Sequence, residues 1–158
     1  MHLSLNLSIS VIQRKAKDYC SYQERSHAEI IKKLHSLGAR KAEVEQVITW
    51  LIEENYLNEE RFALQFARGK FNLKKWGRIK IKQALKQKGV NSYNINLALD
   101  KIDENTYIKT LEKLANKKFA SLKAGTIMIK KMKTIKYLLQ KGYERPVIQQ
   151  AILKLDVH

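Results

Sequence analysis

The chain has 158 residues and a formal net charge of +16 at pH 7, with 44% hydrophobic residues, six glycines, one proline and one cysteine. This hydrophobic content is enough for a folded core and excludes a disordered chain. So few glycines and prolines exclude a β-sandwich or barrel, which needs a turn about every ten residues. Long stretches with few helix breakers therefore predict an all-α fold.

The positive charge is unevenly distributed along the chain. Residues 1–60 carry eight Lys/Arg and nine Asp/Glu, whereas residues 61–158 carry 23 and six. Two stretches, 61–99 and 113–143, contain no acidic residue. A solvated surface mixes both signs, because crowded like charges repel. The segregation therefore predicts a polyanionic partner, a nucleic acid or a complex that contains one, with a membrane surface as the alternative.

The N-terminal segment shows a different pattern from the rest. Apolar residues alternate with polar ones at Leu3, Leu5, Leu7, Ile9 and Val11. This is the period of a strand, but a lone strand is not stable, so we expect no more than an arm there. From Ile9 to Tyr19 we predict a helix. The segment has no basic leader and no small-residue cleavage site, and the chain has no run of 18 apolar residues. We therefore expect a cytoplasmic protein.

Helix-capping residues then mark the next elements in chain order. Ser26 and Glu29 fit a capping box that starts a helix reaching Leu37. Asn58 fits the N-cap of a helix over about 61–71.

A repeat gives the domain organisation. A leucine four residues before a glycine that is itself followed by an apolar residue occurs three times, at intervals of 51 and 53 residues: Leu34 and Gly38, Leu85 and Gly89, Leu138 and Gly142. An apolar residue follows each glycine, which predicts a helix that ends in a Schellman turn before a second helix begins. We predict an N-terminal arm and initial helix at 1–24, then three-helix repeats at 25–71, 72–122 and 123–158. Three repeats are about the minimum for such an array.

Six motifs, two of them the helix ends just described, carry a resemblance. They are Arg25-Ser26-x-x-Glu29-Ile30, the Leu34-x-x-x-Gly38 helix end, Tyr56-Leu57-Asn58-Glu59-Glu60-Arg61-Phe62-Ala63, Trp76-Gly77, Ile79 to Ile81, and Leu85-x-x-Lys88-Gly89-Val90. Together they resemble the RecX family, the modulators of the RecA recombinase. The chain departs from the family at Asn58, where aspartate is frequent, and at Arg78, where proline is frequent. The resemblance implies tandem three-helix repeats in an elongated, curved molecule. It also implies binding to the RecA filament on single-stranded DNA and inhibition of its ATPase, recombinase and coprotease activities, within DNA repair, recombination and the SOS response.

The candidate binding residues are basic side chains and one tryptophan in the acid-free stretches. They are Arg68, Lys70, Lys74, Lys75, Trp76, Arg78, Lys80, Lys82, Lys86, Lys88, Lys130, Lys131, Lys133 and Lys136. Cations neutralise phosphates, and an aromatic ring stacks on a base of a single strand. The alternative for Trp76 is that it packs in the joint between two modules. The alternative for the lysines from Lys130 onward is that they only solvate the exposed face of a helix. We expect the methionines of that helix, Met128 and Met132, in the core.

No catalytic motif is present. The chain has no P-loop or dinucleotide-binding glycine motif, and its four histidines lack metal-ligand spacing. Carboxylates gather at Glu53-Glu54 and Glu59-Glu60, where they fit helix ends. Cys20 fits a partly buried structural thiol. We predict a monomeric binding protein that is not an enzyme and needs no cofactor or metal. The alternative function is a free-standing helical nucleic-acid-binding protein without a recombinase partner.

Overall fold

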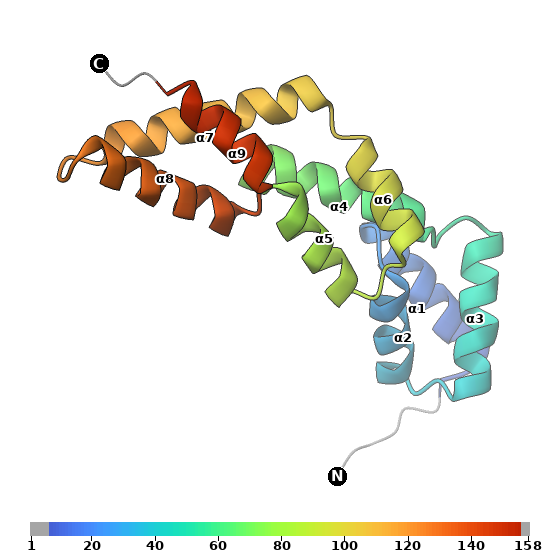
Figure 1. The fold of residues 1–158 in the computed structure, drawn as a ribbon. Helices are drawn as coiled ribbons and strands as arrows, with labels where there is room; N and C mark the ends of the chain where they lie inside the picture. The colour runs from blue at the N-terminus through green and yellow to red at the C-terminus, as the bar shows by residue number, and fades with distance from the viewer. Residues whose placement is uncertain (1–6, 156–158) are drawn as a thin grey trace, which may run out of the picture. The chain divides into compact units, whose positions relative to one another are not determined.

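The computed structural model describes residues 7–155, and every regular element in this range is an α-helix (Figure 1). In chain order these helices are α1 (Ile9–Tyr22), α2 (His27–Ser36), α3 (Lys41–Glu53), α4 (Glu59–Lys74), α5 (Arg78–Gln87), α6 (Ser92–Asp100), α7 (Glu104–Ser121), α8 (Ile127–Lys141) and α9 (Arg145–Leu153). This confirms the predicted all-α fold. None of the helices in this range is long and apolar enough to cross a bilayer.

The predicted helix from Ile9 is confirmed and ends at Tyr22. Most of the alternating N-terminal segment lies outside the described residues, but its last positions, Ile9 and Val11, are helical. The helix prevails over the period of two because Ile12, Ala16 and Cys20 are spaced by four and are all buried. Burial of Cys20 agrees with the predicted structural thiol.

The chain forms two compact units, one of 1–65 with 85–97 and the other of 66–84 with 98–158. In the first unit, α1, α2 and α3 contact one another around a shared apolar core. Ser26 Oγ caps α2 by accepting a hydrogen bond from the Glu29 nitrogen at 3.1 Å. The Glu29 carboxylate binds Lys88 at 3.1 Å instead of returning to Ser26, so half of the predicted capping box is present.

Asn58 caps α4, as predicted, because its Oδ1 accepts a hydrogen bond from the Arg61 nitrogen at 2.9 Å. The helix begins at Glu59 and continues to Lys74, three residues past the predicted end. It stops where Lys75 takes a left-handed backbone conformation, with φ at 59°. No glycine or proline marks that end, so the sequence pattern placed it too early.

The repeated glycines end their helices as predicted. Gly38, Gly89 and Gly142 have φ values of 87°, 78° and 96°, the left-handed region that glycine adopts without a Cβ clash. The residue after each glycine donates a backbone hydrogen bond to the anchor leucine, at 3.0, 3.1 and 3.2 Å in chain order. Each glycine also donates to the residue after that leucine at 3.0 Å. This pair of bonds is the Schellman motif, so the same helix end occurs three times.

In the second unit, α7, α8 and α9 form another three-helix module. Its centre is aromatic: the ring of Tyr107 lies 5.1 Å from that of Tyr143 and 5.7 Å from that of Phe71, measured between centroids. Tyr107 and Tyr143 are fully buried, and Phe71 brings the end of α4 into this core. The aromatic centre therefore fixes the α4–α5 connection on the third module.

Candidate nucleic-acid interface

Two helix connections of the second unit join at their backbones. The Gly77 nitrogen, between α4 and α5, donates to the Lys141 carbonyl at 2.8 Å, and the Ile79 nitrogen donates to the Gly142 carbonyl at 2.9 Å. The two connecting segments in this contact are more than sixty positions apart in the chain. Gly77 is buried there, and its lack of a side chain allows the two backbones to approach closely.

Side chains reinforce this joint. Lys141 Nζ donates to the Lys74 carbonyl at 3.0 Å, and the Tyr143 hydroxyl donates to the Lys75 carbonyl at 2.8 Å. Both bonds satisfy carbonyls at the C-terminal end of α4, which have no partner within the helix. An ammonium group at a helix C-terminus is also favoured by the helix dipole. The joint thus holds Lys74, Lys75 and Lys141 in one place.

Trp76 lies in this joint, half-buried between two lysines. Lys70 Nζ is 4.9 Å from the centroid of its ring and Lys80 Nζ is 4.6 Å from it. Both distances allow a cation–π interaction, worth about 0.5–1 kcal/mol at an exposed site. The ring is therefore neither sealed in a core nor bare to solvent. Lys70, Trp76 and Lys80, with Lys74, Lys75 and Lys141, are called the Trp76 cluster below.

No ion pair with a carboxylate involves a lysine of the Trp76 cluster within the described residues. Glu144, close in sequence to Lys141, is bound elsewhere: Arg78 Nη1 donates to it at 3.0 Å, and the Tyr107 hydroxyl donates to its other oxygen. The cluster therefore keeps its positive charge uncompensated by nearby carboxylates, as a phosphate-binding surface requires.

Arg78 differs from the expectation that it is a free phosphate ligand. Its guanidinium binds Glu104 and Glu144 and stacks 3.8 Å from the centroid of the Tyr107 ring. Burial alone would lower the pKa of Arg78, but the hydrogen bonds to Glu144 and Glu104 outweigh it and raise the pKa. The Arg78 nitrogen also donates to the Tyr107 hydroxyl at 3.0 Å. Arg78 thus holds the module together, and we leave it out of the proposed interface.

Comparison with known proteins identifies the fold family. Residues 58–99 match the model of the second three-helix domain of RecX, and residues 105–152 match that of the third. The chain belongs to the RecX family. The predicted repeats 25–71, 72–122 and 123–158 begin at other residues than these matches, and that division stays a prediction.

Relatives and solved structures agree with this assignment. The proteins named regulatory protein RecX from Bacillus thuringiensis (strain Al Hakam) and Bacillus cereus (strain AH187) are each 30% identical over 141 residues, which cover 89% of this chain and 52% of the relative. The chain thus spans about half the length of these relatives. The crystal structure of RecX from Lactobacillus salivarius has a TM-score of 0.88 at 27% identity, covering 95% of this chain and 97% of that one. A second crystal structure of a regulatory protein RecX has a TM-score of 0.79 at 26% identity, covering 90% and 72%.

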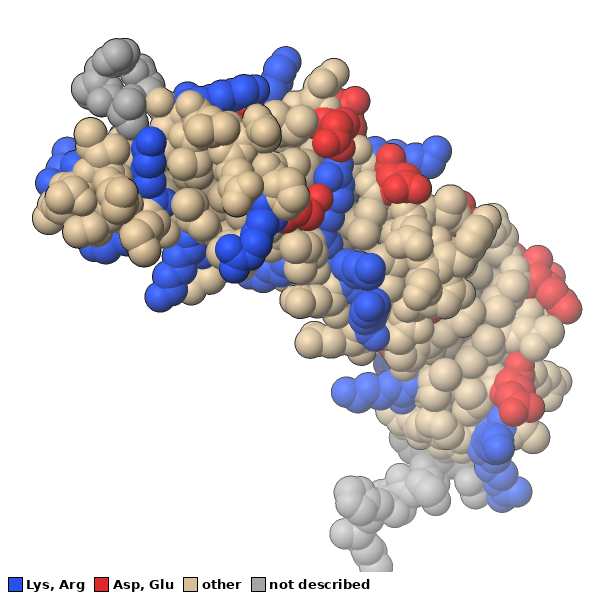
Figure 2. All heavy atoms as spheres, in the orientation of Figure 1, with Lys and Arg blue, Asp and Glu red and all other residues tan. Residues whose placement is uncertain are grey.

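The predicted binding residues are distributed over the two matched RecX domains and over both compact units. Arg68 and Lys82 are exposed in the second domain beside the Trp76 cluster residues Lys70 to Lys80. Lys86, also exposed, and Lys88, paired with Glu29, belong to the first compact unit. The remaining predicted residues lie on α8, in the third RecX domain: Lys130, Lys131, Lys133 and Lys136. In Figure 2, blue Lys and Arg side chains border the second unit along α8.

Sequence reasoning missed Lys141 and placed two methionines wrongly. Lys141 lies in the acid-free stretch directly before Gly142, so its position at a repeated helix end was a usable signal. Met128 and Met132 are exposed, not in the core as predicted. A helical apolar pattern shows which face is apolar but not how far a neighbouring helix extends to cover it.

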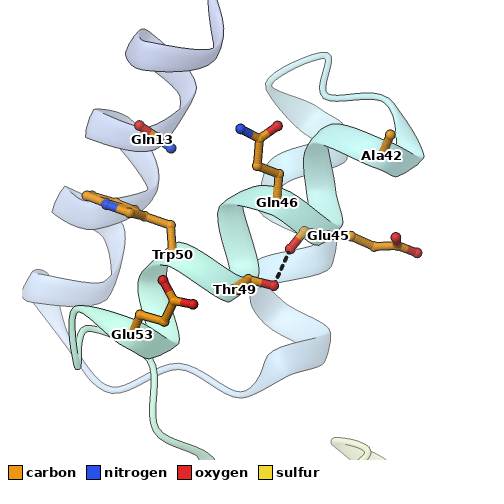
Figure 3. Close-up of a pocket in the computed structure, with 7 residues that line it drawn as sticks. All are labelled: Gln13, Ala42, Glu45, Gln46, Thr49, Trp50 and Glu53. Atoms are coloured by element: carbon orange, nitrogen blue, oxygen red, sulfur yellow. Dashed lines mark hydrogen bonds between the residues drawn. The ribbon is translucent and has the colours of Figure 1, made fainter.

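A shallow hollow lies between α1 and α3 (Figure 3). It measures about 470 Å³ and is lined by Gln13, Ala42, Glu45, Gln46, Thr49, Trp50 and Glu53. Its charged groups are carboxylates, and the Thr49 hydroxyl donates to the Glu45 carbonyl at 2.9 Å. This chemistry does not suit a polyanion, so the hollow is no part of the interface.

Among the described residues, no group of three or more His, Cys, Asp or Glu is placed to hold a metal ion.

Proposed function

We propose that this RecX-family chain binds the RecA recombinase filament on single-stranded DNA and inhibits its ATPase, recombinase and coprotease activities. The observation that carries the proposal is the Trp76 cluster, in which two lysines lie over one half-buried aromatic ring and three more lie at the same joint, none of them in an ion pair with a carboxylate among the described residues. Family membership supports the recombinase as partner, since the relatives are named as regulatory proteins.

The cluster suits contact with a DNA backbone. Lysine ammonium groups act as point charges toward phosphates and read no sequence. A base that stacks on Trp76 displaces one of the two ammonium groups from the ring, and that group then pairs with the adjacent phosphate. Arg68 and Lys82 in the second domain, and the lysines of α8, extend the positive surface. We expect binding with a steep salt dependence and little sequence preference.

The remaining parts of the proposal follow from this role. We propose that the protein works as a monomer in the cytoplasm, within DNA repair, recombination and the SOS response, and that it catalyses no reaction. Its action is through binding alone, so it needs neither a cofactor nor a metal. The elongated, curved shape implied by the family remains a prediction.

The proposal is tested by the single-stranded-DNA-dependent ATPase of the RecA recombinase from the same organism. Substoichiometric protein should reduce the ATPase, because one molecule in the filament contacts several subunits or blocks growth at an end. The inhibition should persist when a competitor oligonucleotide, too short to support a filament, is added in excess. Loss of inhibition in proportion to the competitor would instead favour the free-standing nucleic-acid-binding protein, which acts only by occupying DNA.

A further inference from the structure

Helix α8 is one turn longer than its counterparts in the other repeats. Aligned on the anchor leucine, α2 begins seven residues before Leu34 and α5 seven residues before Leu85, but α8 begins eleven residues before Leu138. The four additional residues, Ile127 to Lys130, amount to one turn at about 3.6 residues per turn. The turn has a regular start, because Thr126 Oγ1 accepts a hydrogen bond from the Ile129 nitrogen at 3.2 Å.

Three apolar side chains of the added turn are exposed, and so is Met132 two residues beyond it. The exposed fractions are 53% for Ile127, 73% for Met128, 44% for Ile129 and 63% for Met132. On the side of α9 the cause is the length of that helix: α8 has 15 residues and α9 has nine, which correspond to about 22 and 14 Å, whereas α7, the other helix in contact with α8, has 18 residues. Since the turn at Gly142 starts α9 beside the C-terminal end of α8, α9 stops before it covers the first turns (Figure 1). We call these four side chains the α8 tip.

Lysines border the α8 tip. Lys130, Lys131 and Lys133 are interspersed with it, and none of them has an ion-pair partner among the described residues. Single exposed apolar residues are ordinary, but four within six positions form a patch. A second copy of this chain would bring the same lysines against these, so self-association through the tip is disfavoured by charge.

The tip fits a protein better than a membrane or DNA. Interfacial membrane helices lie along the surface and use Trp, Phe and Leu, whereas Thr134 and Leu138 turn the rest of α8 into the module core. Phosphate contacts need cations and gain nothing from isoleucine or methionine. Methionine, in contrast, adapts its shape to apolar protein surfaces.

We propose that the α8 tip docks into an apolar depression with a carboxylate rim on a protein surface. In the context of the proposed function, on which this inference rests, that surface belongs to a recombinase subunit, while the Trp76 cluster contacts the DNA. The two surfaces have separate roles. The α8 tip makes the protein prefer the filament over bare DNA, and the lysines of the Trp76 cluster attract the phosphates.

The test compares the double variant Met128→Gln/Met132→Gln with a control, Ile52→Gln/Leu153→Gln, which removes two exposed apolar side chains elsewhere. Affinity is measured for immobilised recombinase filaments on single-stranded DNA, and by fluorescence anisotropy for an oligonucleotide too short to support a filament. We expect the tip variant to lose at least about thirtyfold in filament affinity, the scale of an interface hot spot, with unchanged oligonucleotide affinity. The control should match wild type in both assays.

Each other outcome overturns the inference in a distinct way. Unchanged filament affinity of the tip variant would show that the tip does not dock, and would leave the proposed function standing. A parallel loss for filament and oligonucleotide would make the tip a DNA contact. Binding of wild type to phosphatidylserine vesicles that the variant loses would make it a membrane contact. Wild type that binds filaments no better than the oligonucleotide would overturn the proposed function and this inference together.

Discussion

Gly77 lies directly against the backbone of Gly142, close enough that Gly77 cannot carry a side chain. A Cβ at Gly77 would lie 2.3 Å from the Gly142 carbonyl oxygen, and a Cβ at Gly142 would lie 2.3 Å from the Lys80 Cβ. The obstacle at Gly77 is backbone, so no rotamer change relieves it. This contact holds the α4–α5 connection on the α8–α9 connection and thereby places Trp76 among its lysines.

Gly77→Ala should therefore destabilise the protein by about 1–3 kcal/mol, the usual cost of overpacking a close contact. The matched control is Gly69→Ala in the middle of α4, where nothing lies within 4 Å of the added Cβ. That change should stabilise the protein by about 0.5–1 kcal/mol, because alanine favours helix more than glycine does. Urea unfolding measures both, and a Gly77→Ala variant as stable as wild type would contradict the contact.

Gly89→Val tests the repeated helix end in the second repeat. The nearest atom to an added Cβ is the Ala28 Cβ at 3.9 Å, so space is available. The φ of 78° is the obstacle, and a branched residue there should cost about 1–2 kcal/mol. The free energy of unfolding in urea measures the loss. The control is Lys86→Gln, one turn away at an exposed position, which should stay within about 0.5 kcal/mol of wild type. Equal stability of the Gly89→Val and Lys86→Gln variants would show that the left-handed turn is not required.

Tyr107→Phe tests the network around Arg78. The hydroxyl of Tyr107 accepts from the Arg78 nitrogen and donates to Glu144, so its removal leaves two partly buried groups without that partner. We expect a loss of about 1–3 kcal/mol in chemical denaturation, the range for unsatisfied buried polar groups. Tyr93→Phe removes a hydroxyl from a tyrosine that is 70% exposed and should change stability by no more than about 0.5 kcal/mol. A similar, small effect for both would mean that the network adds nothing.

Cys20 should resist thiol reagents in the folded protein. Burial raises the pKa of its thiol to about 11, although Arg25 acts in the opposite direction. At pH 9 the folded thiol is then mainly protonated, while an unfolded one, with a pKa near 8.5, is mainly thiolate. Because the folded pKa is the higher one, its contribution to stability is present below about pH 8.5 and is lost as pH rises toward 11. Labelling by 5,5′-dithiobis(2-nitrobenzoate) at pH 9 should be slow in buffer and fast in urea; fast labelling in buffer would place the thiol at the surface.

The repeat could be predicted from sequence because its determinant is local. A leucine, a glycine four residues later and the apolar residue after it define the Schellman turn within six positions, and all three turns form. Ser26 and Asn58 cap their helices for the same reason: each accepts a hydrogen bond from the nitrogen three residues on. Such features depend on φ angles and hydrogen bonds that neighbouring residues alone decide.

The candidate site depends instead on residues far apart in the chain. Arg78 lies among lysines in the sequence, but its carboxylate partners are 26 and 66 residues away, and no local pattern shows them. The exposure of Met128 has a similar origin, since it depends on where α9 ends. The positive charge of the Trp76 cluster was predictable from composition, whereas its geometry required the contact between Gly77 and Gly142.

The Trp76 cluster makes a quantitative prediction about salt. Each phosphate neutralised on a single strand contributes about −0.7 to the slope of log K against log[salt]. Lys70→Gln/Lys74→Gln/Lys80→Gln should therefore weaken binding to a short single-stranded oligonucleotide and make the slope shallower by up to about 2. The control, Lys15→Gln/Lys32→Gln/Lys41→Gln, removes the same charge from exposed positions on helices α1, α2 and α3. It should leave the slope nearly unchanged, because net charge acts over long range and is screened beyond about 8 Å at physiological salt. Equal slopes for the two triple variants would show that binding follows overall charge, and would move the DNA contact away from Trp76.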